Sequence, residues 1–328
     1  MSHRECLSPN TSWSITSTAA FTIPTWYLVS LVVNSVLVIT GNIINVLVLH
    51  KMKTLSKTTK MLLVSLSVVD LISGILMAVF SVPSAILGKW VFGDILCICT
   101  GVLYPITLCL SLVFLTLICI DRYISIVKPL HYRLLVTRKR ALVCIVLSSI
   151  AVLICVYIFG SIEKPFDNVR FLPELSSCVI DFLHPCIARL TVILFSIFLF
   201  QPFVTLTVVY LRILCIVHKS AREMAKFDPN RLQHPGGRQH LFRINSKATK
   251  MTLVITGLFI LSWSPYVSTK VYSAATGVNL NPGITYFVVA YLAILNSWWN
   301  FVIYSAMNQR FRQTFVLYYV PKKLHNVF

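Results

Sequence analysis

Apolar stretches long enough to cross a lipid bilayer recur seven times along this 328-residue chain, and no other feature restricts its fold as strongly. A spanning helix needs about 20 mostly apolar residues, because backbone polar groups in lipid must bond within their own segment. The composition agrees, since 57% of the residues are hydrophobic and 12% are charged. We therefore predict an all-α membrane protein, a bundle of seven transmembrane helices. The expected spans are roughly 26–49, 61–87, 94–119, 141–160, 188–217, 251–272 and 284–306.

The net charge of +19 is distributed unevenly between the loops. With loops assigned from the seven spans, 23 of the 29 Lys and Arg residues lie on one side of the membrane. The positive-inside rule places that side in the cytosol. It predicts a multi-pass plasma-membrane protein with an extracellular N-terminus and a cytoplasmic C-terminus. Basic loops beside a membrane attract anionic lipid and acidic partner surfaces, so we expect lipid contacts and no nucleic-acid partner.

The N-terminal residues agree with this orientation. Asn10-Thr11-Ser12 is an acceptor for N-glycosylation, which is usable only outside the cytosol. No basic-then-apolar signal peptide precedes the first span, so we expect that span to act as its own signal anchor.

Asp121-Arg122-Tyr123 closes the third span, and Lys128-Pro129-Leu130-His131-Tyr132 follows it. These and other short motifs within the spans resemble those of the rhodopsin-like (class A) G-protein-coupled receptors. The flanks are nearest to the biogenic-amine and adenosine-type branch. The resemblance covers residues 26 to 319, and the order and spacing of the motifs make it specific. The other matching motifs are Gly41-Asn42, Leu66-Ser67-Val68-Val69-Asp70-Leu71, Trp90-Val91-Phe92-Gly93, Ser262-Trp263-Ser264-Pro265-Tyr266, Asn296 to Tyr304 and Asn308 to Phe315.

The resemblance implies a receptor that converts the binding of an extracellular small molecule or short peptide into activation of a heterotrimeric G protein. It implies three parts: residues 1–25 as an extracellular N-terminus, 26–306 as a seven-transmembrane domain, and 307–328 as a short amphipathic eighth helix with a cytoplasmic tail. A receptor dimer is a further partner to consider. The implied G-protein coupling switch comprises Asp121, Arg122, Tyr123, Tyr210, Asn300 and Tyr304.

Asp121 and Arg122 have two interpretations. Arginines at membrane-helix ends commonly extend to the interface, and the pair would then have no signalling role. In the resembled family, the acid restrains the arginine at rest, and the arginine turns toward the G protein on activation. Many relatives also have an acid at the base of the sixth helix, but Asn245-Ser246-Lys247 has none. We therefore expect a weaker inactive lock and appreciable basal activity.

Asp70 lies about ten residues into the second span, where a charged side chain is costly and is a functional-site candidate. It is either part of a structural polar cluster between helices or, as the resemblance implies, the acid of an allosteric sodium site. We expect no other cofactor. The implied sodium ligands are Asp70, Ser111, Asn296 and Asn300.

Five of the ten cysteines fall on the outer, oxidising side, so at least one of them has no intramolecular partner among the five. The resemblance implies a disulfide between Cys97 and the long outer loop, with Cys178 the preferred partner. Cys99 with Cys186 is a second pairing.

The ligand is the least constrained part of the prediction. Tyr104 stands where amine receptors have the aspartate that pairs with the ammonium group, so an amine is disfavoured. Aromatic walls with few polar anchors suit a partly apolar or heteroaromatic ligand, whereas acidic residues in the outer loops favour a cationic ligand or peptide. Trp263 beside Pro265 is either an ordinary aromatic at a kink or a gating residue. The implied pocket residues are Tyr104, Trp263, Tyr266, Lys270, Tyr286 and Tyr291.

Two departures from the family pattern stand out. Phe301 replaces a proline of the seventh helix, so the kink expected there is altered, and Asn45 adds an amide to the first helix. Phe301 keeps open an alternative in which the chain is constitutively active or non-coupling and acts as the partner of another receptor.

Other classes of membrane protein are disfavoured. No internal repeat suggests a transporter. The eight histidines form no H-E-x-x-H pattern or other ligand-spaced set, so we do not expect an enzyme.

Overall fold

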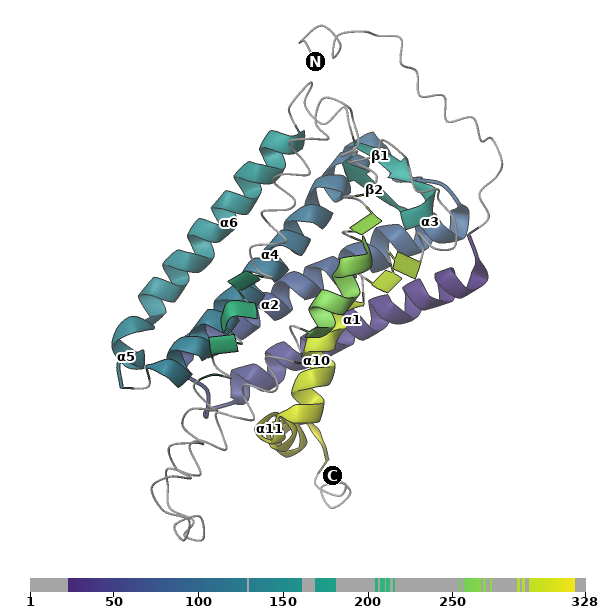
Figure 1. Cartoon of the computed structure of the whole chain (residues 1–328). Helices are drawn as coiled ribbons and strands as arrows, with labels where there is room; N and C mark the ends of the chain where they lie inside the picture. Colours follow the sequence, from purple (N-terminus) through teal and green to yellow (C-terminus); the bar gives the residue numbers. More distant parts are fainter. Residues whose placement is uncertain are drawn as a thin grey trace, which may run out of the picture.

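The computed structural model describes residues 23–128, 130–160, 169–180 and 295–321, together with single residues and short stretches between 204 and 292 (Figure 1). The predicted fifth and sixth spans lie largely outside the described part, as does the first half of the predicted seventh.

Long apolar helices dominate the described residues. Among these residues, four stretches are long and apolar enough to cross a membrane, and they match the first four predicted spans. Their outward faces are apolar and exposed, as in α6, where Leu147 is 61% and Tyr157 is 63% exposed. The elements that form them are α1 (Thr25–Lys51), α2 (Lys57–Leu76) continued by η2 (Met77–Ser81) and α3 (Val82–Leu87), α4 (Asp94–Val127) and α6 (Arg138–Gly160).

A five-residue π-helical turn, η2, separates α2 from α3, and the apolar pattern of the second span does not predict it. Pro83 lies in the first turn of α3, directly after η2. A proline has no N–H to donate, so local rearrangement of the helix compensates for the lost hydrogen bond. The π turn thus keeps the second span helical from Lys57 to Leu87.

A tight aromatic turn joins α3 to α4. Gly88 and Gly93 adopt positive φ angles of 65° and 81°, which residues with a Cβ rarely reach. Between them, the Trp90 ring stacks on Phe80 at 6.0 Å and meets Phe92 edge-on at 5.1 Å. This turn places Cys97 in the first turn of α4.

A β-hairpin that the sequence did not predict covers this end of α4. Strands β1 (Val169–Leu172) and β2 (Ser177–Ile180) are antiparallel and are joined by the 3-10 turn η3 (Pro173–Leu175). Cys178 on β2 is fully buried and forms a disulfide with Cys97. We call this end of the bundle the disulfide end.

The second pairing predicted from the sequence, Cys99 with Cys186, is wrong. Cys99 is an exposed free thiol. Because two residues turn an α-helix by about 200°, Cys99 points away from the hairpin that Cys97 faces.

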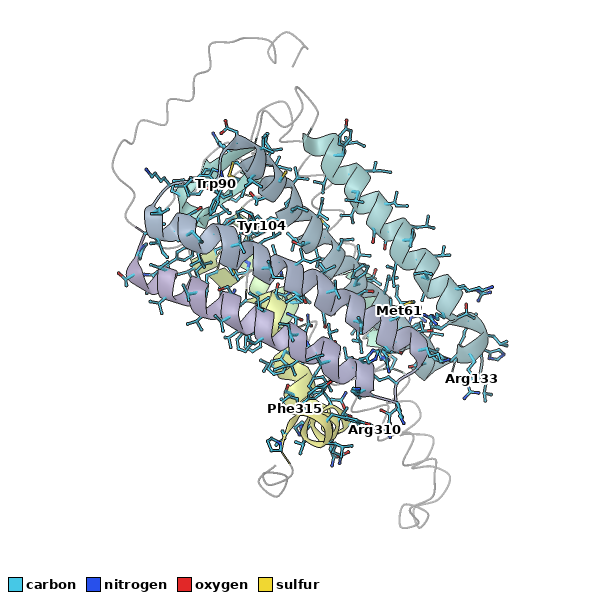
Figure 2. The ribbon with its side chains drawn as sticks, turned by 180° about the vertical axis from the view of Figure 1, so that it is seen from behind. Met61, Trp90, Tyr104, Arg133, Arg310 and Phe315 are labelled. Carbon is cyan, nitrogen blue, oxygen red and sulfur yellow. A yellow bond between two sulfur atoms is a disulfide. The ribbon has the colours of Figure 1, made fainter. Side chains whose placement is uncertain are left out.

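The opposite end of the bundle holds the largest apolar cluster. It joins α1, α2 and α4 to α10 (Asn296–Met307) and α11 (Gln309–Tyr319), which lies beside α1. Tyr319 of α11 donates a hydrogen bond to the carbonyl of Leu47 at 3.1 Å. Figure 2 shows Trp90 and Tyr104 toward the disulfide end and Arg133, Arg310 and Phe315 toward this end, which we call the Arg122 end. Close packing of this kind holds membrane helices together, because lipid is itself apolar and gives no hydrophobic driving force for helix association.

Candidate functional site

A hydrogen-bonded cluster surrounds Asp121 near the C-terminal end of α4. The carboxylate is 3% exposed and accepts a hydrogen bond from Thr59 at 2.8 Å. Its second oxygen accepts from the hydroxyl of Tyr132 at 2.6 Å. The guanidinium of Arg122 pairs with the same carboxylate at 3.1 Å. One carboxylate therefore receives three donors, one of them charged.

Asp121 lies within the last two turns of α4, which ends at Val127. Local capping positions its two neutral donors. Ser56 is the N-cap of α2 and accepts from the backbone N–H of Thr59 at 3.0 Å, which fixes the first turn of that helix. Tyr132 begins α5 (Tyr132–Leu135), a single turn that follows α4. Burial raises the pKa of Tyr132, and its hydrogen bond to Asp121 raises it further. The phenol therefore stays protonated and able to donate at physiological pH.

Thr59 and Tyr132 belong to the candidate site, but the sequence analysis did not single them out as site residues. Tyr132 ends the motif from Lys128 to Tyr132 that follows the third span, and this motif was the signal that could have identified it as a site residue. Thr59 carried no signal, because it lies 62 residues before Asp121 and only the packing of α2 against α4 brings them together.

A second polar cluster surrounds Asp70 in the middle of α2. Asp70 is 1% exposed, and its two carboxylate oxygens accept hydrogen bonds from Ser111 of α4 and Asn300 of α10, each at 3.0 Å. Asn296, the remaining predicted sodium ligand, begins α10 one turn before Asn300 and shares its helix face. The carboxylate and hydroxyl oxygens are donors of the kind that hard cations prefer, so the residue types fit a small cation.

Tyr304 lies between these two clusters. It is 3% exposed, and its ring packs 6.2 Å from that of Phe311 in α11. It lies within electrostatic range of both Arg122 and Asp70. Of the other predicted switch residues, Tyr123 is half-buried on α4, and Tyr210 lies outside the described residues.

The predicted ligand pocket is described only in part. The hydroxyls of Tyr104 and Ser81 share a hydrogen bond of 2.6 Å between α4 and η2, and Figure 2 shows Tyr104 toward the disulfide end. Trp263 meets Tyr266 edge-on at 5.8 Å within the helical residues 257–266. Tyr291 is half-buried. Lys270 and Tyr286, like the glycosylation acceptor Asn10, lie outside the described residues.

Phe301, the departure from the family pattern, lies inside an unbroken helix. α10 runs from Asn296 to Met307 with Phe301 at its centre, and a side chain on Gly41 of α1 would begin 3.1 Å from the phenyl ring. The absence of a Cβ at Gly41 therefore makes room for the ring. Asn42 beside it donates to the carbonyl of Ser297 at 3.1 Å, so α1 and α10 are in direct contact here.

Both polar clusters lie within a region that is shared with known proteins. Residues 41–304 match the sequence profile of the family described as 7 transmembrane receptor (rhodopsin family). This match spans most of the chain. The chain belongs to the rhodopsin family of seven-transmembrane receptors. It is therefore a multi-pass plasma-membrane protein and a G-protein-coupled receptor, not an enzyme, and it converts the binding of an extracellular ligand into activation of a heterotrimeric G protein.

Relatives and solved structures agree with this assignment. The chain is 27% identical to the tachykinin-like peptides receptor 99D of Drosophila melanogaster over 92% of its own length, although it spans only 59% of that receptor. It is 28% identical to the human histamine H2 receptor, covering 87% of this chain and 76% of the receptor. It is 27% identical to the rat trace amine-associated receptor 7h, covering 88% and 81%.

The fold resembles that of squid rhodopsin, with a TM-score of 0.75, 22% identity, and coverage of 91% of this chain and 87% of the rhodopsin chain. The predicted all-α, seven-helix class is thereby confirmed.

Proposed function

We propose that this receptor signals by releasing Arg122 from Asp121. In the described conformation, Arg122 is held by the adjacent carboxylate, which Thr59 and Tyr132 anchor to α2 and α5. A conformational change that moves Thr59 and Tyr132 away from Asp121 weakens the ion pair between Asp121 and Arg122. The freed Arg122, whose side chain is 21% exposed, then contacts the G protein at the Arg122 end. The observation that supports this proposal is the Asp121 carboxylate, which accepts from three donor groups.

The short segment between α4 and α6 is the neighbouring part of the proposed docking face. Leu130 is 90% exposed there, beside a shallow hollow of about 520 Å³ lined by Val127, Lys128, Leu130, His131, Leu134 and Leu135. An exposed leucine over an apolar hollow suits contact with an apolar partner surface. Basic residues around it favour an acidic partner.

Replacing Asp121 with asparagine should raise ligand-independent G-protein activation about fivefold. Asparagine has nearly the same shape, but it is neutral and cannot form the ion pair. A pair with one partly exposed member is worth about 1 kcal/mol, which corresponds to about fivefold in an equilibrium. Basal G-protein activation in cells at matched surface expression measures this.

Thr59→Val is the graded comparison for that experiment. It removes one neutral donor to Asp121 and leaves the ion pair, so its basal signal should rise in the same direction but by less. Basal activity of D121N equal to that of the wild type would contradict the proposed restraint.

For the orientation, we propose that the disulfide end faces outward. The disulfide belongs in an oxidising compartment, and the basic loops lie at the Arg122 end. Residues 1–25, with Asn10 as a glycosylation site, would then be extracellular and residues 307–328 cytoplasmic. We also propose that α11 lies along the inner membrane surface, since Leu317 is 66% and Tyr318 is 48% exposed. Nothing in the described residues favours a particular dimer interface.

For the ligand, we propose recognition by aromatic and hydroxyl groups rather than by an ammonium–carboxylate pair. Tyr104 is already bonded to Ser81, and its phenol carries no charge to pair with an ammonium. Although relatives include receptors named for histamine and trace amines, this chain lacks the acidic partner on α4. Trp263, Tyr266 and Tyr291, with Lys270 and Tyr286, would supply the remaining walls.

We propose further that Asp70, Ser111, Asn296 and Asn300 bind a sodium ion that favours the resting conformation. The support is a fully buried carboxylate between hydroxyl and amide groups of two other helices. Such a buried charge is stabilised when a cation pairs with it.

Sodium should stabilise the purified receptor against heating, and Asp70→Asn should abolish that response. A ligand present at ten times its dissociation constant stabilises the bound state by about 1.4 kcal/mol. The unfolding midpoint is compared in sodium chloride and in choline chloride of the same ionic strength. Asp94→Asn, which neutralises an exposed carboxylate at the start of α4, should keep the full sodium response. A sodium response retained in D70N would rule this site out.

The alternative function, a constitutively active or non-coupling partner of another receptor, is favoured by one observation. Phe301 makes α10 unbroken where the family has a proline, and its ring packs against α1 at Gly41. A stiffer α10 that stays against α1 would limit the movement of Tyr304. Equal silence of the wild type and D121N with every G protein would favour the non-coupling form of this alternative.

A further inference from the structure

Asn45 of α1 is the least satisfied polar side chain in the described part of the bundle. It is 0% exposed, and neither its Nδ2 nor its Oδ1 atom has a hydrogen-bond partner among the described residues. A carboxamide offers two donors and an acceptor oxygen. Folded proteins pair nearly all such buried groups with protein or with ordered water. Among the described hydrogen bonds, Asn45 belongs neither to the Asp70 cluster nor to the Asp121 cluster.

Helix geometry shows what Asn45 faces. Asn42 and Asn45 are three residues apart and share one face of α1. Asn42 donates to the carbonyl of Ser297 at 3.1 Å, so this face lies against α10. Ser297 and Tyr304 are seven residues apart and share one face of α10. Asn45 therefore lies against α10 between the levels of Ser297 and Tyr304.

Two further buried atoms without partners among the described residues lie on these same two faces. They are Oδ1 of Asn42 and the hydroxyl of Tyr304. Long side chains on a helix lean toward its N-terminus, which carries the Tyr304 hydroxyl back toward the level of Asn45. Val48, Leu49 and Tyr304 belong to one buried apolar cluster, which closes this region toward the Arg122 end.

We propose that Asn45 is the centre of a buried water-binding site between α1 and α10, which links its amide to Asn42 Oδ1 and to the Tyr304 hydroxyl. The site offers donors and acceptors together, so a ligand that both donates and accepts is required. A bare cation leaves Nδ2 unpaired, and an anion leaves Oδ1 of both asparagines unpaired. A buried water makes about three hydrogen bonds to groups of this kind. The water ties Tyr304 to α1 in the described conformation.

Asn45→Leu tests the site, because leucine has the shape of asparagine without its polar atoms. If water links Asn45 to its neighbours, the substitution leaves Asn42 Oδ1 and the Tyr304 hydroxyl without a hydrogen-bond partner. The unfolding midpoint of the full-length receptor in nanodiscs then falls by about 2–4 °C. If no water contacts the amide, the substitution removes a buried polar group that has no hydrogen-bond partner, and the unfolding midpoint rises. An unchanged or raised midpoint overturns the proposal.

A double-substitution comparison shows whether Tyr304 shares the site. In the Tyr304→Phe background, the shift caused by N45L should shrink to half or less, because one of the linked groups is already gone. Asn34→Leu is the matched control, since Asn34 is also a fully buried α1 asparagine but bonds to Met77 of η2. Its shift should be the same in both backgrounds. An N45L shift that is equally large in Y304F would overturn the link to Tyr304.

A high-resolution crystal structure of the wild-type receptor gives a result that does not depend on any variant. Water density should appear within hydrogen-bonding distance of both Asn45 Oδ1 and Nδ2. An amide that contacts only apolar atoms, with no water density, would overturn the proposal.

Discussion

Arg122→Ala should abolish G-protein activation, both basal and ligand-driven, while leaving the receptor at the cell surface. The guanidinium is the charged donor of the Asp121 cluster and is 21% exposed at the Arg122 end. Arginines at the centre of an interface commonly contribute about 2 kcal/mol or more to binding, so its loss should weaken G-protein engagement roughly 30-fold or more. The measurement is activation across a panel of labelled heterotrimers, first without ligand and then with pools of amines, nucleosides, lipids and peptides.

The matched control for that experiment is Arg133→Ala. Arg133 directly follows Tyr132 on α5, is exposed, and makes no contact with Asp121 among the described hydrogen bonds and ion pairs. Its removal lowers the positive charge of the same surface by one. R133A should therefore retain most of the signal, and equal losses in R122A and R133A would indicate a general effect of surface charge.

Cys178→Ser should destabilise the receptor strongly, because it breaks the covalent link between the β-hairpin and α4. The disulfide between Cys97 and Cys178 closes a loop of 81 residues. A cross-link of this length restricts the unfolded chain by about 4.5 kcal/mol in the chain-entropy description. Without it, the hairpin keeps its packing contacts with α4, as where Val169 lies against Gly101, but loses the covalent link. We expect a sharp fall in surface expression and a much lower unfolding midpoint.

Cys99→Ser serves as the control for the disulfide. Cys99 is two residues from Cys97 on the same helix, but it is an exposed free thiol. Its replacement should change stability by no more than about 0.5 kcal/mol, as for most surface substitutions. If C178S and C99S behave alike, the disulfide contributes little to the folded receptor.

Much of the fold could be predicted because membrane helices are encoded locally. A run of about 20 apolar residues is both required for a span and visible in the sequence. The first four spans therefore matched their helices within a few residues, except at the end of the third, where α4 continues from residue 119 to Val127. Asp70 stood out for a related reason, since a carboxylate in an apolar run needs partners. Ser111 and Asn300, which the family resemblance supplied as partners, do bond to it.

The features that could not be predicted depend on contacts between distant segments. Thr59 reaches Asp121 across 62 residues, and its own neighbourhood resembles an ordinary helix start. The hairpin of β1 and β2 has strands of four residues each, too short for alternation to stand out from loop sequence. The π turn at Met77–Ser81 lies directly before the proline-containing first turn of α3, and the apolar composition of the span does not indicate it.

The most direct measurement compares basal G-protein activation of D121N with that of the double variant D121N/R122A, at matched surface expression and without ligand. If Asp121 acts by restraining Arg122, D121N is more active than the wild type, and the double variant is no more active than R122A alone. A double variant as active as D121N would contradict that mechanism, because the raised activity would then not pass through Arg122.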